Sequence, residues 1–338
     1  MHAIVLVGGF GTRLRPLTDS VPKSMLTIGN EPIITRLVRR LERCDVATVT
    51  LALGFLPDPF LDAFPGGRCG TVEVRYAVES EPLDTAGAIR FAAGLAGVDD
   101  TFLAINGDII TDLDLTALVL EHRRLGGEAT IHLTPVADPS AFGVVETDTD
   151  GRVERFLEKP LPGTTESTMI NGGTYVMEPS VLDAIAPAVP VNVERVTFPQ
   201  LATRGTLFGV ATDDYWIDVG RPELLLQANL DRLAGRYDTT LPHPVSGGNG
   251  VDPDAIVAID ALLSGSVVAG DVEIGSRSVV ARSVLLAGSR IGEDVVVHDS
   301  VVMGRVADRA QLRHAVVGVG AQISPGQQVT DERIPAPS

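Results

Sequence analysis

The chain has 338 residues, which is enough for two domains and a sizeable hydrophobic core. Its net charge of −17 argues against a nucleic-acid-binding surface, because phosphate contacts need clustered Lys and Arg. Two cysteines are too few for a disulfide framework, and the first apolar run is too short for a signal peptide or a membrane span. We therefore expect a soluble cytoplasmic protein with no membrane partner.

Strand and helix patterns alternate through the first two thirds of the chain. The predicted strands are 4–7, 46–53, 72–78, 101–105, 129–136, 144–146, 153–156, 174–177 and 207–210, and the predicted helices are 32–43, 85–95, 115–125 and 223–233. This alternation predicts a parallel sheet covered by helices on both faces. Asp150-Gly151 predicts a hairpin between the strands on either side of it.

The sequence pattern changes after residues 235–250, which are rich in Gly, Pro and Ser and are predicted to be a linker. Beyond it, apolar residues recur about every six positions, as at Ile274, Val280 and Leu286. This period is typical of a parallel β-helix, and the few imperfect repeats predict a short, partly irregular one. An ordinary β-sandwich is the alternative. The expected domains are thus 1–234 and 251–330, and we expect the second to mediate homo-oligomer formation rather than chemistry.

The N-terminal strand is followed by a glycine-rich turn at residues 8–11, and then by Arg13 and Lys23. Such a turn exposes backbone N–H groups that can hold phosphate oxygens, to which an arginine adds a bidentate clamp and a lysine a point charge. Lys23 and Lys159 are the only lysines among the 27 basic residues. A compact ammonium group suits phosphate, which favours binding roles for both. The alternatives are a surface ion pair for Arg13 and chance survival of two lysines.

Two aspartates stand in conspicuous positions. Asp108 follows a predicted strand in Asn106-Gly107-Asp108, and Asp218 follows an aromatic residue in Trp216-Ile217-Asp218. Ligands of parallel sheets bind at the carboxyl ends of the strands. Mg²⁺ typically takes one or two carboxylates together with phosphate oxygens, so both residues are candidate metal ligands. The alternative is that each is an ordinary turn or cap aspartate.

The segment from Leu6 to Thr18, followed by Pro22-Lys23, resembles the signature of sugar-1-phosphate nucleotidyltransferases, and among them most of all the mannose-1-phosphate guanylyltransferases. Further similar segments follow in order at 81–87, 106–108, 142–145, 156–160, 170–173 and 216–220. The resemblance covers the chain to about residue 232, and a β-helical tail fits it. It implies an α/β fold in which a Rossmann-like nucleotidyltransferase domain is followed by a short left-handed parallel β-helix.

The resemblance also implies a reaction, in which GTP or another NTP and a sugar 1-phosphate, in first place mannose 1-phosphate, give an NDP-sugar and pyrophosphate. The implied catalytic residues are Arg13, Lys23 and Asp108, and the implied Mg²⁺ ligands are Asp108 and Asp218. The implied nucleotide-binding residues are Leu6, Gly8, Gly9, Gly11, Thr12, Glu79, Asp84 and Thr85. Those implied for the sugar phosphate are Gly143, Glu158, Lys159, Asn171 and Gly172.

Several positions depart from the family pattern. Asp84 stands where glycine is usual and Gly172 where alanine is usual, while Ser24 and Val196 replace a common proline and a second acid. An aspartate tolerates a left-handed backbone, but its charge needs a partner, for which a ribose or substrate hydroxyl is one candidate. Gly172 is expected to enlarge the sugar pocket slightly. These departures leave the acceptor open to other sugar or cyclitol phosphates, of the heptose or valienol phosphate type.

Two functions of other classes remain as alternatives. One is a non-catalytic regulatory paralogue that binds an NDP-sugar, although such proteins typically lose the catalytic charges that this chain retains. The other is a β-helical acyltransferase, for which His298 and His314 are the histidines of the tail.

Overall fold

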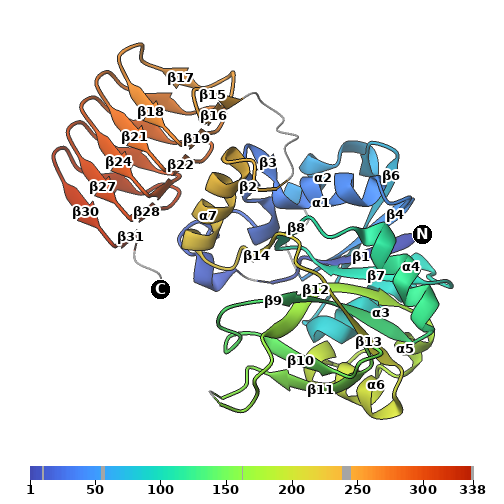
Figure 1. The fold of residues 1–338 in the computed structure, drawn as a ribbon. Coiled ribbons are helices and arrows are strands. Elements are labelled where there is room, and N and C mark those ends of the chain that lie inside the picture. Colours follow the sequence, from blue (N-terminus) through green and yellow to red (C-terminus); the bar gives the residue numbers. More distant parts are fainter. Residues whose placement is uncertain (10, 55–57, 162, 238–244, 336–338) are drawn as a thin grey trace. The chain divides into compact units, whose positions relative to one another are not determined.

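The computed structural model describes residues 1–9, 11–54, 58–161, 163–237 and 245–335. Its contacts group the chain into two units, which we call the first unit (Met1–Gly9 and Ile34–Trp216) and the second unit (Phe10–Ile33 and Ile217–Ser338). Figure 1 shows the ribbon. Among the described residues, no helix combines the length and the apolar composition needed to cross a membrane.

The first unit is built on a ten-stranded mixed sheet, whose main path runs β11-β10-β12-β7-β1-β4-β6-β5. Its strands are β1 (His2–Leu6), β4 (Thr48–Leu53), β5 (Arg68–Cys69), β6 (Val72–Val78), β7 (Phe102–Asn106), β9 (Ala129–Pro135), β10 (Gly143–Thr147), β11 (Val153–Glu158), β12 (Met169–Met177) and β13 (Leu207–Ala211). β7, β1, β4 and β6 are parallel. Ala3, Ile4 and Val5 of β1 are fully buried, as expected for a central strand of such a sheet.

The helices of this unit are α1 (Ile33–Glu42), α2 (Asp58–Ala63), α3 (Asp84–Ala96), α4 (Leu115–Leu125), α5 (Ser180–Asp183) and α6 (Phe198–Arg204), with a π-helical turn at Val193–Thr197. α3 contacts β1, β4 and β6 through small buried residues such as Ala86, Ala88 and Ala92, which allow close packing on the sheet. α4 begins at an N-cap, where Asp114 accepts a hydrogen bond from Ala117 N, and ends at Gly126 in the left-handed conformation.

The elements predicted in this unit are present, with bounds shifted by a few residues. The largest shift is at β12, which begins at Met169 rather than at 174. Asn171-Gly172-Gly173 has the composition of a turn, but Asn171 pairs with Leu133 of β9 and the register then shifts before Tyr175. The elements that the sequence did not indicate are short, namely β5, α2, α5, α6 and β8 (Ile109–Thr111). β14 (Trp216–Asp218) lies at the boundary between the units.

The second unit contains the predicted β-helix as three sheets, which are parallel except for one antiparallel pair at the start of the first sheet and are consistent with the left-handed form. One sheet contains β15 (Val245–Ser246), β16 (Asn249–Val251), β19 (Val267–Val268), β22 (Val284–Leu285), β25 (Val301–Val302), β28 (Val316–Val317) and β31 (Arg333–Ile334). The second contains β17 (Ile256–Val257), β20 (Glu273–Ile274), β23 (Arg290–Ile291), β26 (Arg305–Val306) and β29 (Gln322–Ile323), and the third β18 (Leu262–Ser264), β21 (Val279–Ala281), β24 (Val296–His298), β27 (Gln311–Arg313) and β30 (Gln328–Thr330).

The coils of the β-helix are more regular than expected, and the β-sandwich alternative is wrong. Each new coil begins about 17 residues after the last, with one shorter step before Val316. β15 and β16 already belong to the first sheet, so the second half of the predicted linker is part of the β-helix. Residues 238–244 of that linker lie outside the described residues.

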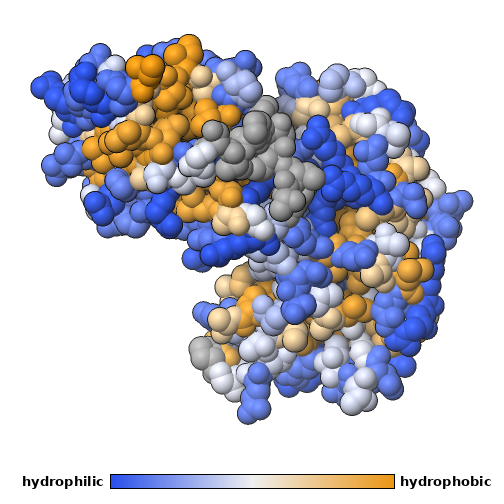
Figure 2. Space-filling view, turned by 45° about the horizontal axis from the view of Figure 1, so that its top comes forward, coloured by the Kyte–Doolittle hydropathy of each residue, from blue (hydrophilic) through white to orange (hydrophobic). Residues whose placement is uncertain are grey.

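Buried side-chain hydroxyls connect successive coils at one corner of the β-helix. Ser266 Oγ accepts a hydrogen bond from Ser283 N at 3.2 Å, Ser283 Oγ from Ser300 N at 3.1 Å, and Ser300 Oγ from Ala315 N at 3.0 Å. Each hydroxyl therefore satisfies a backbone N–H that the corner would otherwise leave buried without a partner. On the outside, Ile256, Ile259 and Leu262 of the first coil are exposed, and Figure 2 shows hydrophobic side chains gathered over part of the β-helix surface.

α7 (Pro222–Leu233) and the segment 10–33 belong to the second unit together with the β-helix. That segment contains two 3-10 turns (Thr12–Leu14 and Lys23–Met25) and the short strands β2 (Thr27–Ile28) and β3 (Glu31–Pro32). α7 was expected to close the catalytic domain, whereas its contacts group it with the β-helix. The domain boundaries expected from the sequence stay a prediction.

Candidate functional site

Seven of the predicted site residues line one cavity of about 340 Å³ in the first unit. They are Leu6, Gly8, Gly9, Glu79, Asp84, Thr85 and Asp108. β1, β6 and β7 lead into this cavity at their carboxyl ends, and α3 begins at its wall. These residues therefore meet at the carboxyl ends of the parallel strands, where ligands of such sheets bind, and their binding roles stay a prediction. Ala52 and Asn106, which the resemblance did not single out for binding, also line the cavity.

The glycines after β1 keep the backbone accessible at this cavity. A Cβ at Gly8 would lie 3.1 Å from Gly54 N, so a side chain at this position would require a small shift of the backbone that follows β4. A Cβ at Gly9 would meet nothing within 4 Å, which leaves open space beside its peptide group. The turn can thus present backbone N–H groups to a phosphate or a base.

Glu79 follows β6 and places an acceptor at the cavity wall. Its Oε2 accepts a hydrogen bond from Leu83 N at 3.0 Å. Burial raises the pKa of this carboxyl above its ordinary value, the Leu83 N–H opposes the shift, and the nearby charge of Asp84 adds to it.

The first turn of α3 explains how the chain accommodates an aspartate where glycine is usual. Asp84 has φ 57°, so the expectation that it tolerates a left-handed backbone is confirmed. Its Oδ1 accepts hydrogen bonds from Thr85 N at 2.6 Å and from Asn192 Nδ2 at 3.1 Å. The charge therefore has partners within the chain, and it needs no ribose or substrate hydroxyl to satisfy it. Thr85 Oγ1 in turn accepts from Val193 N at 2.8 Å.

The residues predicted to bind the sugar phosphate lie on the neighbouring strands β11, β10 and β12. Gly143 pairs with Glu158 in the β10–β11 register, and a Cβ at Gly143 would lie 2.8 Å from the Phe156 ring. Lys159 comes directly after β11 with φ 47°, a strained conformation of the kind that often marks a functional position. Its Nζ lies 3.2 Å from Glu158 Oε1, and the side chain is 60% exposed and thus available to a ligand.

Asn171 is buried and organises a polar cluster that the sequence did not reveal. Its Nδ2 donates to Tyr175 OH at 2.9 Å and to Glu194 Oε1 at 2.7 Å, while its Oδ1 accepts from Gly173 N at 3.0 Å. Both amide hydrogens are therefore engaged within the chain. The only sequence signal near Glu194 was Val196, which stands two residues later where the family usually has a second acid. Direct contact between Asn171 and a sugar hydroxyl stays a prediction.

Burial raises the pKa of Glu194 to about 7, and the nearby Glu158 carboxylate adds to the shift, while the Asn171 amide opposes it. The ordinary value is 4.5, so between these two pH values the folded protein holds a proton that the unfolded chain releases. The stability contributed by this proton is complete below about pH 4.5 and is lost as the pH rises through 7.

We therefore expect Glu194→Gln to gain stability relative to the wild type by about 1–3 kcal/mol between pH 5 and pH 8, since glutamine does not titrate. Thermal unfolding of both proteins across this range measures the difference. Glu166→Gln, a change at an exposed glutamate, is the control. Parallel pH profiles for Glu194→Gln and the wild type would contradict the raised pKa.

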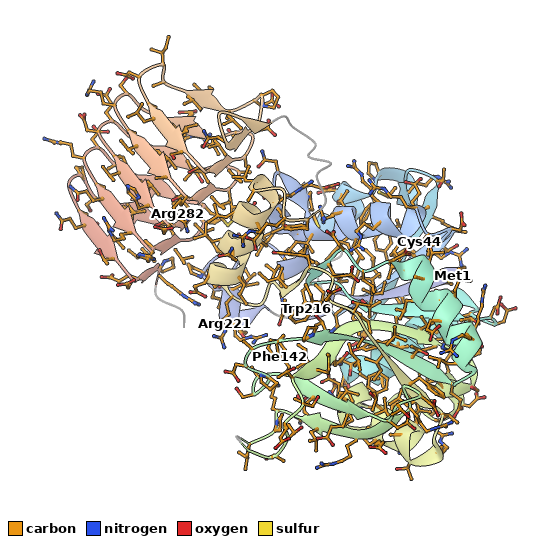
Figure 3. The ribbon with its side chains drawn as sticks, viewed as in Figure 1. Met1, Cys44, Phe142, Trp216, Arg221 and Arg282 are labelled. Carbon is orange, nitrogen blue, oxygen red and sulfur yellow. The ribbon has the colours of Figure 1, made fainter. Side chains whose placement is uncertain are left out.

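Gly172 makes room for a histidine rather than for a larger sugar. A Cβ at Gly172 would lie only 2.3 Å from Nδ1 of the buried His132 on β9, and 3.0 Å from its backbone oxygen. The expected enlargement of the pocket is thus wrong, because His132 fills the space of the missing methyl. Burial lowers the pKa of His132 to about 4, so the ring is neutral. Trp216 Nε1 donates to Gly172 O at 2.9 Å, and the Trp216 ring packs edge-on against Phe142 (Figure 3).

The remaining predicted residues lie in the second unit. Gly11 has φ 60°, and its carbonyl accepts a hydrogen bond from Thr18 Oγ1 at 2.8 Å. A Cβ at Gly11 would lie 3.3 Å from Lys23 Cβ, so the lysine stem lies against the turn. Lys23 Nζ is 3.3 Å from Asp218 Oδ1, with side chains 12% and 22% exposed. Thr12 and Arg13, in the first 3-10 turn, are exposed.

Comparison with known proteins shows the family. Residues 2–235 match the family model for nucleotidyl transferases. The chain belongs to the nucleotidyl transferase family. The match covers the glycine turn, the residues that line the cavity, the strands β10, β11 and β12, and α7, and it ends before the β-helix.

Individual members of the nucleotidyl transferase family agree with this assignment. A mannose-1-phosphate guanyltransferase of Aspergillus oryzae is 38% identical over 75% of this chain and 72% of its own. A mannose-1-phosphate guanylyltransferase of Mycobacterium tuberculosis is 38% identical over 81% of this chain and 77% of its own. The solved structure of HddC from Yersinia pseudotuberculosis complexed with GMP-PN superposes with a TM-score of 0.57 at 28% identity, over 68% of this chain and 97% of HddC. The resemblance inferred from the sequence is thus confirmed.

Proposed function

We propose that this nucleotidyl transferase is a mannose-1-phosphate guanylyltransferase, which transfers the guanylyl group of GTP to a sugar 1-phosphate and releases pyrophosphate. The observation that carries the proposal is the cavity at the carboxyl ends of β1, β6 and β7, which is lined by six of the eight nucleotide-binding residues expected from the family. The names of the Aspergillus and Mycobacterium relatives support the choice of substrates, and the GMP-PN complex of HddC supports the choice of base.

The reaction needs charge stabilisation more than proton transfer. The attacking group is an oxygen of the sugar phosphate, whose second pKa is about 6, so it is already ionised near pH 7. Its bond to the α-phosphorus forms as the bond from that phosphorus to the bridging oxygen breaks, and pyrophosphate leaves with the negative charge. Arg13 and Lys23 bind the triphosphate, and Lys159 holds the incoming phosphate, so that two polyanions are brought together in line.

Asp108 and Asp218 are the residues that would hold Mg²⁺. Among the described residues, no group of three or more His, Cys, Asp or Glu side chains is arranged around a common metal position. Mg²⁺ is a hard cation that typically takes one or two carboxylates and draws its other ligands from phosphates and water. When bound, the metal supplies positive charge to the phosphate oxygens. Lys23, 3.3 Å from Asp218, places its own positive charge beside that carboxylate.

GTP is the expected nucleotide because guanine presents an N1–H and an N2 amino group, both donors, on one edge. Glu79, an acceptor at the cavity wall, suits this edge, whereas uracil and thymine offer one N–H between two carbonyls. We expect kcat/KM for GTP to exceed that for ATP, UTP or dTTP by at least about tenfold, the value of a single hydrogen bond. Pyrophosphate release over a matrix of NTPs and sugar 1-phosphates measures it. A higher kcat/KM with UTP or dTTP would contradict the guanine preference.

The same matrix tests the acceptor. Mannose 1-phosphate is the first candidate, followed by heptose phosphates and by cyclitol phosphates of the valienol phosphate type. Because His132 fills the space beside Gly172, this position gives no reason to expect a larger acceptor. A kcat/KM of about 10⁶ M⁻¹s⁻¹ with mannose 1-phosphate would establish this compound as the natural acceptor. The absence of turnover with every pair would favour a non-catalytic regulatory role.

We further propose that the protein is cytoplasmic and forms a homo-oligomer through the β-helix. The support for the oligomer is that Ile256, Ile259 and Leu262 in the first coil are all exposed, since exposed apolar surface often marks protein contacts.

A further inference from the structure

Within the second unit, the segment 10–33 contains Arg13 and Lys23. Hydrogen bonds with α7 and the β-helix hold the C-terminal end of this segment. Asn229 Oδ1 of α7 accepts a hydrogen bond from Gly29 N at 2.8 Å. The buried Arg232, also on α7, donates to Ile28 O. Asn30 Nδ2 donates to Val268 O of β19 at 3.0 Å. Residues some 200 positions later in the chain thus fix residues 27–30.

The N-terminal end of the same segment is held by the last strand of the β-helix. Arg333, on β31, donates from Nη1 to Arg13 O at 2.7 Å and more weakly to Arg15 O at 3.3 Å. Its Nη2 pairs with Glu223 Oε1 in the first turn of α7 at 3.0 Å. The planar guanidinium therefore joins two backbone carbonyls of the segment to a carboxylate of α7, which a single ammonium group would do less well.

A second contact fixes the same stretch. Gly318 directly follows β28, the neighbour of β31, and a Cβ there would lie 2.7 Å from Pro16 Cβ and 3.1 Å from Pro16 O. The β-helix therefore packs closely against Pro16, next to Arg15, and leaves no room for a side chain at position 318.

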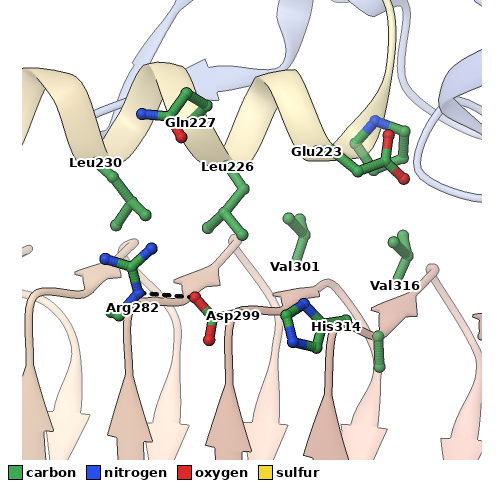
Figure 4. A pocket seen from close by; sticks show the side chains of 11 residues that line it. Glu223, Leu226, Gln227, Leu230, Arg282, Asp299, Val301, His314 and Val316 are labelled. Atoms are coloured by element: carbon green, nitrogen blue, oxygen red, sulfur yellow. Dashed lines mark hydrogen bonds and ion pairs between the residues drawn. The ribbon is translucent and has the colours of Figure 1, made fainter. Parts of the chain in front are cut away.

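α7 rests on the β-helix through a limited set of side chains. Figure 4 shows Leu226 and Leu230 pointing towards the β-helix, with Glu223 at the end of the same row. A groove of about 250 Å³ remains between them, where Arg282 pairs with Asp299 at 2.8 Å. Beside this groove, the bond between Arg333 and Glu223 adds a directed contact between α7 and the last strand of the β-helix.

We propose that Arg333 is a positioning residue for nucleotidyl transfer, which holds the backbone of Arg13 so that its guanidinium is presented to the triphosphate. The proposal rests on the function proposed above, in which Arg13 binds that triphosphate. It gives the β-helix a part in the chemistry, in place of the expectation that this region serves assembly alone.

The test compares Arg333→Ala and Arg333→Lys with Arg305→Ala, a change at an exposed arginine of β26, in the full-length protein. We expect Arg333→Ala to lower kcat/KM for GTP by about 10- to 100-fold, the cost of a misplaced catalytic group. The KM for the sugar phosphate should stay within about twofold, and the thermal midpoint should match that of Arg305→Ala. Arg333→Lys, which keeps one donor to Arg13 O, should recover part of the loss. Equal kinetics for Arg333→Ala and Arg305→Ala would overturn the proposal.

Two further variants separate this proposal from the function on which it rests. Arg13→Ala should abolish tight GTP binding, and adding Arg333→Ala to it should have no further effect on the GTP dissociation constant, because Arg333 acts through Arg13. Additive losses would overturn the positioning role. Full activity of Arg13→Ala would instead refute the proposed role of Arg13. Gly318→Ala, which pushes on Pro16, should lower kcat/KM for GTP as Arg333→Ala does, and unchanged kinetics in that variant would count against the proposal.

Discussion

Asp218→Asn and Asp108→Asn should each lower pyrophosphate release by about 10³-fold or more while the protein stays folded. Asparagine keeps the shape of the side chain but removes the negative charge that a divalent cation needs. In Asp218→Asn the change also removes the charge that faces Lys23 Nζ at 3.3 Å. The asparagine amide can still accept a hydrogen bond from Lys23 Nζ, so the protein should stay folded.

Asp114→Asn is the matched control for both variants. Asp114 caps α4 by accepting a hydrogen bond from Ala117 N, and asparagine is an equally good N-cap. Its turnover and thermal midpoint should therefore equal those of the wild type. A titration with Mg²⁺ would show a weaker apparent affinity for the metal in the two site variants alone. If either variant releases pyrophosphate at a rate within tenfold of the wild type at saturating Mg²⁺, that residue is not a metal ligand.

The cavity of the first unit was predictable because several of the residues that line it lie close to strand ends. A buried strand followed by Gly8 and Gly9, and a second strand followed by Asp108, must meet at one edge when the strands are parallel neighbours. Local pattern and the topology rule are sufficient there. Glu79 joined the same cavity for the same reason, as it follows β6.

The polar cluster around Asn171 was not predictable, since it depends on packing between distant segments. Glu194 lies on a π-helical turn with no periodic signal, and only the folded chain brings it 2.7 Å from the Asn171 amide. The space beside Gly172 likewise depends on the rotamer of His132, forty residues earlier. A comparison of single positions with the family pattern indicated that something differed at Gly172, but not what filled the gap.

The grouping of the segment 10–33 with the β-helix could not be predicted from the sequence either. The bond from Arg333 to Arg13 O spans 320 positions in the chain. No local propensity encodes such a pair, and the linker at 235–250 suggested a boundary where contacts instead continue. The hexapeptide period did predict the β-helix, because each coil repeats the same short pattern.

Replacement of the two lysines by alanine should affect different kinetic constants. Lys159→Ala should raise KM for the sugar phosphate by about tenfold or more and leave KM for GTP within about twofold, since a 60% exposed side chain beside Glu158 is placed to bind a ligand. Lys23→Ala should instead lower kcat and raise KM for GTP, since the lysine stem lies against Gly11 and its ammonium lies beside Asp218. Steady-state kinetics with each substrate varied in turn measures whether Lys159 serves the sugar phosphate and Lys23 serves GTP.

Arginine at the same positions tests why lysine is present. Arg supplies the same charge through a longer, planar fork, so Lys23→Arg should keep the protein folded and yet recover less than about a tenth of the lost kcat/KM, because the space beside Gly11 and Asp218 is confined. Lys159→Arg, on an exposed side chain, should recover most of the affinity for the sugar phosphate. Equal effects of the two alanine variants on both substrates would contradict the division. Equal recovery by both arginine variants would show that charge alone, and not the compact ammonium, explains the two lysines.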